Sequence, residues 1–199
     1  MARLLSEQEL LRRESLNKLK GLGIDPFPAA EYQVSHYAKD LSTQYSEGVD
    51  GFENVCIAGR LMTKRIMGKA SFAVLTDSTG DLQIYVNRDE VCPGEDKAMY
   101  NDVFKKLLDI GDFVGVRGHM FVTQTGEISL HVKELTVLSK SLRPLPVVKT
   151  DGDGNVYDAL TDPEIRYRQR YVDLIVNPRV KDIFRKRNRV ISTLSLIHI

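Results

Sequence analysis

A short basic stretch followed by an aromatic residue is the part of this sequence best suited to binding a ligand. Arg60, Lys64, Arg65 and Lys69 lie close together with no acidic residue among them, and Phe72 follows directly. Cations can pair with phosphates and an aromatic ring can stack on an unpaired base, so this combination suits single-stranded nucleic acid. An ordinary hairpin with a solvated basic turn explains the same pattern equally well.

The elements that must position these residues are indicated by apolar periodicity after residue 53. The expected elements are strands near 55–61, 70–75 and 82–86, a helix near 99–108, and strands near 113–122 and 128–138. This order is typical of an OB-fold, a five-stranded barrel that binds oligonucleotides across its second and third strands. Phe72 and Gln83 would lie on that face, so the predicted fold and the basic motif agree.

Two details of the predicted barrel follow from spacing. In the third strand the apolar residues are spaced by two and point inward, which places Gln83 and Tyr85 on the outward side. In the fifth strand the inward spacing slips to three between Val132 and Leu135. We therefore expect a β-bulge near Lys133 and Glu134.

An amphipathic helix is predicted before the barrel. Ser6 and Glu9 form a capping box, and Gly21 or Gly23 supplies the end. Most of its leucines share one arc: Leu4, Leu5, Leu11, Leu16, Leu19 and Leu22. We expect that arc to pack on its own domain or on a partner subunit, because a polar face of mixed sign does not favour a membrane surface. One further short helix is expected within residues 29–52.

The chain after the barrel begins with an extended linker at 142–146 and a turn at 151–154. The turn is not a calcium loop, because Val156 replaces the glycine at position six and Asp162 replaces the glutamate at position twelve. A helix with many arginines starts near Thr161. We divide the chain into an N-terminal segment (1–52), a barrel (53–138), a linker (139–160) and a C-terminal part (161–199).

Composition limits the function. With 199 residues, 42% hydrophobic and 28% charged, the chain has the make-up of a soluble globular protein without a membrane span. The barrel segment carries 10 basic and 12 acidic residues, so its net charge is −2 and any nucleic-acid contact must be local. Cys56 and Cys92 lie far apart without nearby histidines, which favours free thiols in a reducing cytosol over a disulfide or metal site.

Five stretches together carry a resemblance to a known family. They are Arg60 to Phe72, Gln83 to Val86, Thr125 to Ser129, Leu142 to Pro146 and Arg166 to Leu174. In this order they resemble the N-terminal part of a bacterial-type class II lysyl-tRNA synthetase, from about residue 6 to residue 193. Five separated motifs in the same order make the resemblance specific. Their amino-acid sequences favour the lysyl enzyme over the related aspartyl and asparaginyl enzymes.

The resemblance implies that the barrel reads the U-rich anticodon of a lysine tRNA. The residue matching Phe72 stacks on an anticodon base, the one matching Gln83 hydrogen-bonds the central uracil, and those matching Arg65 and Glu127 complete the pocket. Arg60, Lys64 and Lys69 are expected as phosphate contacts. The whole family enzyme is a cytoplasmic homodimer that uses ATP and Mg²⁺ to charge the tRNA.

The chain departs from the family pattern at its end. The motifs that hold ATP are absent, and residues 194–199 do not match, as expected of a truncation. We expect this chain to have no catalytic residues and to be inactive in lysyl-adenylate formation. A stand-alone OB-fold module that binds RNA or single strands without catalysis is the alternative, and nothing inside the chain separates the two.

Overall fold

The computed structural model of the chain describes residues 4–46, 48–146, 149–150, 156–157 and 160–197. They belong to two units, Met1–Pro144 and Leu145–Ile199, which we treat separately. The predicted N-terminal segment and barrel therefore share one unit. The boundary between the units falls inside the predicted linker.

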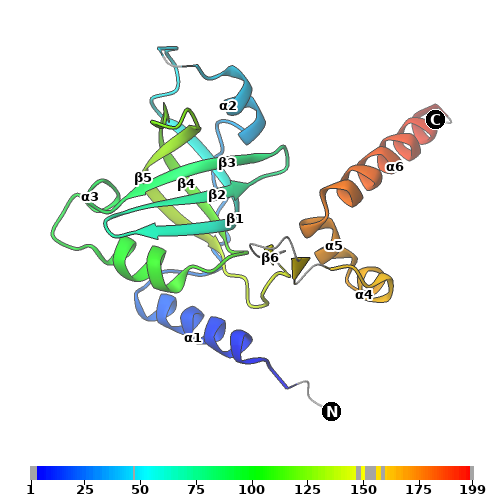
Figure 1. Ribbon diagram of the computed structural model, residues 1–199, viewed down its shortest axis with the longest axis horizontal. Coiled ribbons are helices and arrows are strands. Elements are labelled where there is room, and N and C mark those ends of the chain that lie inside the picture. Colours follow the sequence, from blue (N-terminus) through cyan, green and yellow to red (C-terminus); the bar gives the residue numbers. More distant parts are fainter. Residues whose placement is uncertain (1–3, 47, 147–148, 151–155, 158–159, 198–199) are drawn as a thin grey trace. The chain divides into compact units, whose positions relative to one another are not determined.

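The first unit contains a closed five-stranded barrel (Figure 1). Its strands are β1 (Val55–Met67), β2 (Ala70–Thr76), β3 (Asp81–Asn87), β4 (Phe113–Val122) and β5 (Ile128–Ser139). The order around the barrel is β1-β2-β3-β5-β4, with β4 pairing back onto β1. The β3–β5 pair is parallel and the others are antiparallel. The predicted OB-fold is confirmed.

Strand alternation follows the predicted pattern. Leu82, Ile84 and Val86 are buried in the core, so Gln83 and Tyr85 face outward. The predicted bulge in β5 is also present: Arg117 pairs with Glu134 and the next residue pairs with Val132, which leaves Lys133 as the extra residue. A Cβ atom at Gly118 would lie 1.8 Å from the carbonyl oxygen of His131, so glycine is required opposite the bulge.

Helix α1 (Glu7–Gly21) begins with the predicted capping box. The backbone N–H of Glu9 donates to the Ser6 hydroxyl, and the Ser6 N–H donates to the Glu9 carboxylate. The leucine arc packs on its own unit only in part, and packing of the rest on a partner subunit stays a prediction. Within the arc Leu19 is fully buried, but Leu11 and three other leucines stay exposed, whereas Arg12 is only 7% exposed. The buried face of α1 is therefore narrower than the leucine arc, and the Arg12 side chain forms part of it.

Three more helices belong to this unit. Helix α2 (Ala38–Gln44) matches the short helix expected in the connecting segment, and α3 (Arg88–Val91) was not expected. Helix η1 (Met99–Leu107) lies where a helix was predicted. It has π-type geometry, since the N–H of Leu108 donates to the carbonyl of Val103 at 2.9 Å, five residues back. Its Tyr100 and Phe104 belong to the buried core.

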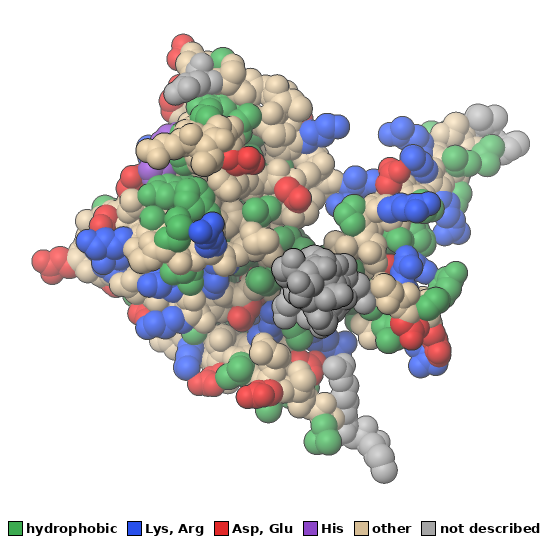
Figure 2. Space-filling model, viewed as in Figure 1, with side chains coloured by type: hydrophobic (Ala, Val, Ile, Leu, Met, Phe, Trp, Pro, Cys, Tyr) green, Lys and Arg blue, Asp and Glu red, His purple; other side chains and the backbone are tan. Residues whose placement is uncertain are grey.

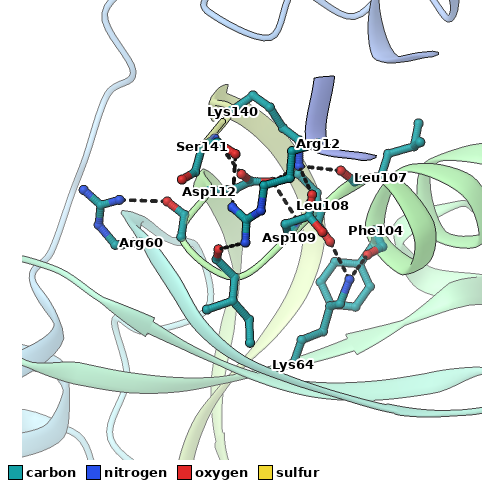
Figure 3. A network of polar contacts seen from close by, with 12 residues as sticks. Arg12, Arg60, Lys64, Phe104, Leu107, Leu108, Asp109, Asp112, Lys140 and Ser141 are labelled. Atoms are coloured by element: carbon teal, nitrogen blue, oxygen red, sulfur yellow. Dashed lines mark hydrogen bonds and ion pairs between the residues drawn. The ribbon is translucent and has the colours of Figure 1, made fainter. Parts of the chain in front are cut away.

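A buried ion pair holds the chain together where β5 ends. Lys140 has a fully buried side chain whose Nζ lies 2.7 Å from Asp112, 2.5 Å from Asp109 and 2.7 Å from the carbonyl oxygen of Leu107 (Figure 3). Asp112 also accepts the backbone N–H groups of Asp109 and Ser141. Burial raises the pKa of Asp112, and the Lys140 ammonium opposes that rise.

Two further cations complete this buried charge network, which we define as Arg12, Lys64, Asp109, Asp112 and Lys140. The Arg12 guanidinium donates to the carbonyls of Ile110 at 2.9 Å and Ser141 at 3.1 Å (Figure 3). Lys64 reaches the same region from β1. The network therefore ties α1, the end of η1, β1 and the chain leaving β5 to one another.

The second unit contains a two-stranded ladder, β6 (Lys149–Thr150) with β7 (Val156–Tyr157), and three helices. The helices are α4 (Pro163–Arg168), α5 (Arg170–Val176) and α6 (Pro178–Ile197). The single C-terminal helix predicted is thus divided into three. Its predicted start is confirmed, since Asp162 caps α4. The turn predicted at 151–154 lies outside the described residues.

A buried carboxylate explains the helix breaks in this unit. Asp173 is fully buried and accepts from Arg166 at 3.0 Å and from Asn177 at 2.6 Å, and it also pairs with Arg170. These partners come from α4, from α5 and from the residue before α6, so α4, α5 and the start of α6 are held together by one acid. On the surface of this unit, basic side chains lie among apolar ones (Figure 2). Among the described residues no helix has the length and apolar character needed to span a membrane.

Candidate nucleic-acid interface

Two rows of outward side chains cross the barrel face. Cross-strand pairing places Arg65, Phe72, Tyr85, His131 and His119 in the first row, and Thr63, Val74, Gln83, Ser129 and Phe121 in the second. Neighbouring positions in a row come from adjacent strands and lie on the same side of the sheet. The register therefore brings Arg65, Phe72 and Gln83, which the sequence singled out, onto one surface.

A groove of about 670 Å³ runs over these rows. Its lining residues come from β1, β2, β3, β4 and the β4–β5 turn: Thr63, Arg65, Met67, Phe72, Ala73, Val74, Gln83, Tyr85, Phe121, Thr123, Gln124 and Thr125. The wall is thus built of aromatic rings, hydroxyl and amide groups, and one arginine. Such a mixture can stack a planar ring and at the same time hydrogen-bond its edge.

Gln83 is held in a defined position in the groove. Its Nε2 donates to the Ser129 hydroxyl at 2.8 Å, across the parallel β3–β5 pair. The Ser129 hydroxyl also contacts the carbonyl oxygen of Glu127 at 3.4 Å. Ser129 itself is fully buried. An amide anchored in this way presents a fixed pattern of donor and acceptor to a ligand.

Phe72 belongs to a cluster of aromatic rings. Its ring centroid lies 5.1 Å from that of Tyr85, which is 5.9 Å from Phe121 and 4.8 Å from His131. Burial lowers the pKa of His131, the Glu90 carboxylate opposes that change, and His119 adds to it. The Phe72 ring is therefore flanked by Tyr85 on the same face of the sheet and remains half-buried.

The other predicted binding residues are placed differently. Arg65 is exposed at the groove, directly opposite Phe72 in the register. Glu127 is exposed in the β4–β5 turn, where its backbone pairs with Thr123, and its side chain is not part of the groove lining. Lys69 is exposed in the β1–β2 turn. The contacts of Glu127 and Lys69 with RNA remain predictions.

Lys64 has a structural role instead of the predicted phosphate contact. Its ammonium donates to three carbonyls at the end of η1 and just after it, those of Phe104, Lys105 and Leu108, at 3.0, 3.2 and 2.6 Å (Figure 3). These three bonds use all its N–H groups, so none remains for a phosphate. Burial lowers the pKa of Lys64, and Asp109 opposes the change.

Arg60 is also engaged within the protein. Its guanidinium donates to the carbonyl of Gly111 at 2.8 Å and lies 4.2 Å from the centroid of the Phe113 ring. Burial lowers its pKa and Asp112 opposes this. Arg60 still has further N–H groups, so a phosphate contact by Arg60 stays a prediction.

Sequence reasoning did not include several residues of the groove. Tyr85 was placed on the outward side but was not proposed as part of the site, although its aromatic character and alternation were visible. Phe121 carries the same kind of signal in the fourth strand. Ser129, which does not line the groove, belongs to a stretch that carried the resemblance but was not proposed as part of the site, because its contact with Gln83 depends on the parallel pairing of β3 with β5.

The described residues contain no group of three or more histidine, cysteine or acidic side chains arranged to hold a metal ion. The site is thus one of aromatic, amide and cationic groups. These suit binding and discrimination of a ligand.

Comparisons with known proteins agree with this interpretation. Residues 55–138 match the family of OB-fold nucleic acid binding domains. The chain is 58% identical over 195 residues to the lysine–tRNA ligase of Porphyromonas gingivalis (strain ATCC BAA-308 / W83), which covers 96% of this chain and 33% of that protein. It is 56% identical over 190 residues to the lysine–tRNA ligase of Azobacteroides pseudotrichonymphae, with 96% and 38% covered. The corresponding identity to the enzyme of Christiangramia forsetii is 54% over 190 residues, with 96% and 33% covered.

The similarity covers nearly the whole of this chain but only a limited part of each relative. The chain spans about a third of the length of the curated relatives it matches. Its aligned part includes the whole barrel together with the flanking helices. The chain is therefore similar to lysine–tRNA ligases over about a third of their length, and its residues 55–138 match the family of OB-fold nucleic acid binding domains.

Proposed function

We propose that the groove reads the anticodon loop of a lysine tRNA, as the recognition part of a lysine–tRNA ligase. The observation that carries the proposal is the placement of Phe72 and Gln83 on adjacent strands, where both line one groove of an OB-fold. Arg65 stands beside them with an exposed guanidinium. The similarity to lysine–tRNA ligases supports lysine tRNA as the ligand.

The chemistry of the groove matches an unpaired uracil. The pairing edge of uracil offers one N–H donor between two carbonyl acceptors, which a carboxamide can meet with one acceptor and one donor. Stacking on Phe72 adds about 1–3 kcal/mol per base. Arg65 supplies a charge for a carbonyl or a phosphate near the same base.

The remaining activities are proposed for the whole ligase. These are ATP- and Mg²⁺-dependent charging of the tRNA, assembly as a homodimer and a cytoplasmic location. In the part of the chain that the structure describes, no donor set fits a metal ion, so we derive no catalytic step from these residues.

Binding of anticodon stem-loops tests the proposal. A stem-loop with the lysine anticodon is compared with one whose central U is changed to C, using the wild type, Phe72→Ala and Gln83→Ala at two salt concentrations. We expect Phe72→Ala to weaken binding of both loops by about 5- to 150-fold, the equivalent of about 1–3 kcal/mol. Gln83→Ala is expected to reduce the preference for U.

Equal binding of both loops, with a steep salt dependence and no effect of Phe72→Ala, would contradict the proposal. Nonspecific attraction between cations and phosphates would then account for the binding. That result would favour a general single-strand binding module.

A further inference from the structure

We infer that Ser129 is a positioning residue that makes the groove prefer uracil over cytosine by fixing the orientation of the Gln83 amide. The inference rests on the proposed function and assigns a specificity role to a buried residue that does not itself line the groove. Three features carry it: the buried position of Ser129, its two hydrogen bonds, and the symmetry of a carboxamide.

The hydroxyl of Ser129 has one proton, and its two neighbours compete for it. The carbonyl oxygen of Glu127, at 3.4 Å, can only accept. When Ser129 donates to that carbonyl, its own oxygen is left to accept from Gln83, so the nitrogen end of the amide turns toward Ser129 at 2.8 Å. Both contacts are then satisfied in one arrangement.

This arrangement leaves the oxygen end of Gln83 available to a ligand. Among the described residues Gln83 Oε1 has no hydrogen-bond partner. It is not among the buried polar atoms that lack one, so it is accessible from the groove. The amide thus offers Oε1 as an acceptor and the second N–H of Nε2 as a donor. An acceptor beside a donor complements the N3–H and a carbonyl of uracil.

Rotation of the same amide by half a turn would reverse the pattern. Cytosine has an acceptor at N3 and a donor amino group beside it, so a flipped carboxamide pairs with cytosine as well as the unflipped one pairs with uracil. An unanchored glutamine can therefore adapt to either base. When stacking on Phe72 also fixes the position of the base, a glutamine held by Ser129 disfavours cytosine, because a flip would give up the bond to the serine or the bond from the serine to Glu127.

The test is the ratio of stem-loop affinities for central U and central C, measured with the full chain in wild type and Ser129→Ala. We expect the U/C ratio to fall by about three- to tenfold, the factor equivalent to one ordinary hydrogen bond, mainly because the C loop binds better. Ser129→Thr keeps a hydroxyl and is expected to retain most of the ratio.

Ser71→Ala is the matched control. Ser71 is also a fully buried strand serine with a side-chain hydrogen bond, to Tyr100 at 2.8 Å, but it faces the core. Ser71→Ala should lose a similar amount of stability but leave the U/C ratio unchanged. An unchanged ratio in Ser129→Ala, with a wild type that prefers U, would overturn the inference while leaving the proposed function intact. A wild type without preference would overturn both.

A measurement on the wild type covers the case in which Ser129→Ala does not fold. In an NMR spectrum the Gln83 side-chain amide, identified by its loss in Gln83→Ala, is compared with that of the exposed groove residue Gln124. We expect the Gln83 amide protons to exchange with solvent more slowly and to differ more in shift. Indistinguishable behaviour of the two amides would overturn the inference.

Discussion

The groove and the buried charge network both use basic residues of β1, and they use them in opposite ways. Arg65 pairs in register with Phe72 on the outer face, where its guanidinium is exposed. Its neighbour Lys64 pairs with the buried Ala73 and points to the carbonyls at the end of η1. Within a basic run on a strand, the face on which a residue lies decides whether it can meet a ligand.

The two regions also differ in what their charges can contribute. In the network most of the charges are desolvated, so removing one leaves a buried partner without the group that compensates it. In the groove the polar groups lie near water, so removing one changes binding and has little effect on folding. Changes in the network should therefore reduce stability, and changes in the groove should reduce RNA affinity.

The largest effect is expected from Lys140→Met. Asp112 would lose its ammonium partner in a fully buried site, which should lower the free energy of unfolding by about 3–5 kcal/mol. Urea denaturation measures this. Lys106→Met is the control, because Lys106 pairs with Asp102 on the surface and should cost at most about 0.5 kcal/mol. Equal losses in the two variants would contradict the role of Lys140.

A smaller loss of stability is expected from Lys64→Ala. Three carbonyls would lose a charged donor, and the end of η1 would lose its cap, which should cost about 1–3 kcal/mol. At a temperature where the variant is folded, its affinity for the anticodon stem-loop should match that of the wild type. An affinity loss with unchanged stability would instead place Lys64 on the RNA.

Arg65→Ala should give the reverse result. Its stability should stay within about 0.5 kcal/mol of the wild type, because Arg65 is exposed. Stem-loop binding should weaken, and if the guanidinium meets a phosphate the slope of log K against log salt should decrease by about 0.7. Binding measured at several salt concentrations separates this from a contact to a base, which would leave the slope unchanged. Unchanged binding at every salt concentration would remove Arg65 from the interface.

Local sequence signals predicted the strands, the α1 capping box and the bulge at Lys133, because each depends on residues close together in the chain. They did not predict the face of Lys64. Leu61 points inward, and simple alternation from it would send Lys64 outward and Arg65 inward. A second bulge at Met62 reverses the order, since Leu61 pairs with Leu75 but Thr63 pairs with Val74.

Long-range contacts account for the other differences. The leucines of α1 predicted an apolar buried face, but the charged Arg12 is buried as well. Its guanidinium donates to the carbonyls of residues 110 and 141. Ser129 reaches Gln83 through the parallel β3–β5 pair, which joins strands separated by α3, η1 and β4. No periodicity within one element reports such a pairing.

The acid that joins α2 to the barrel gives the smallest effect and a distinct pH dependence. Burial tends to raise the pKa of Asp77, but hydrogen bonds from the Ala38 N–H, from Thr79 and from the Gly80 N–H outweigh it and lower the pKa. Because the unfolded chain then binds a proton more readily than the folded one, ionised Asp77 stabilises the fold above its usual pKa of 3.8. This stabilisation is lost as the pH falls through the lower folded value.

Asp77→Asn should therefore lower the free energy of unfolding by about 1 kcal/mol at neutral pH, and its difference from the wild type should shrink below about pH 4. Denaturation at a series of pH values measures the difference. Asp40→Asn, an exposed acid of the same helix α2, is the control and should show little change at neutral pH. RNA binding should be unaffected at neutral pH, because Asp77 does not line the groove. A difference that stays constant down to about pH 3 would show that the charge of Asp77 is not what joins α2 to the barrel.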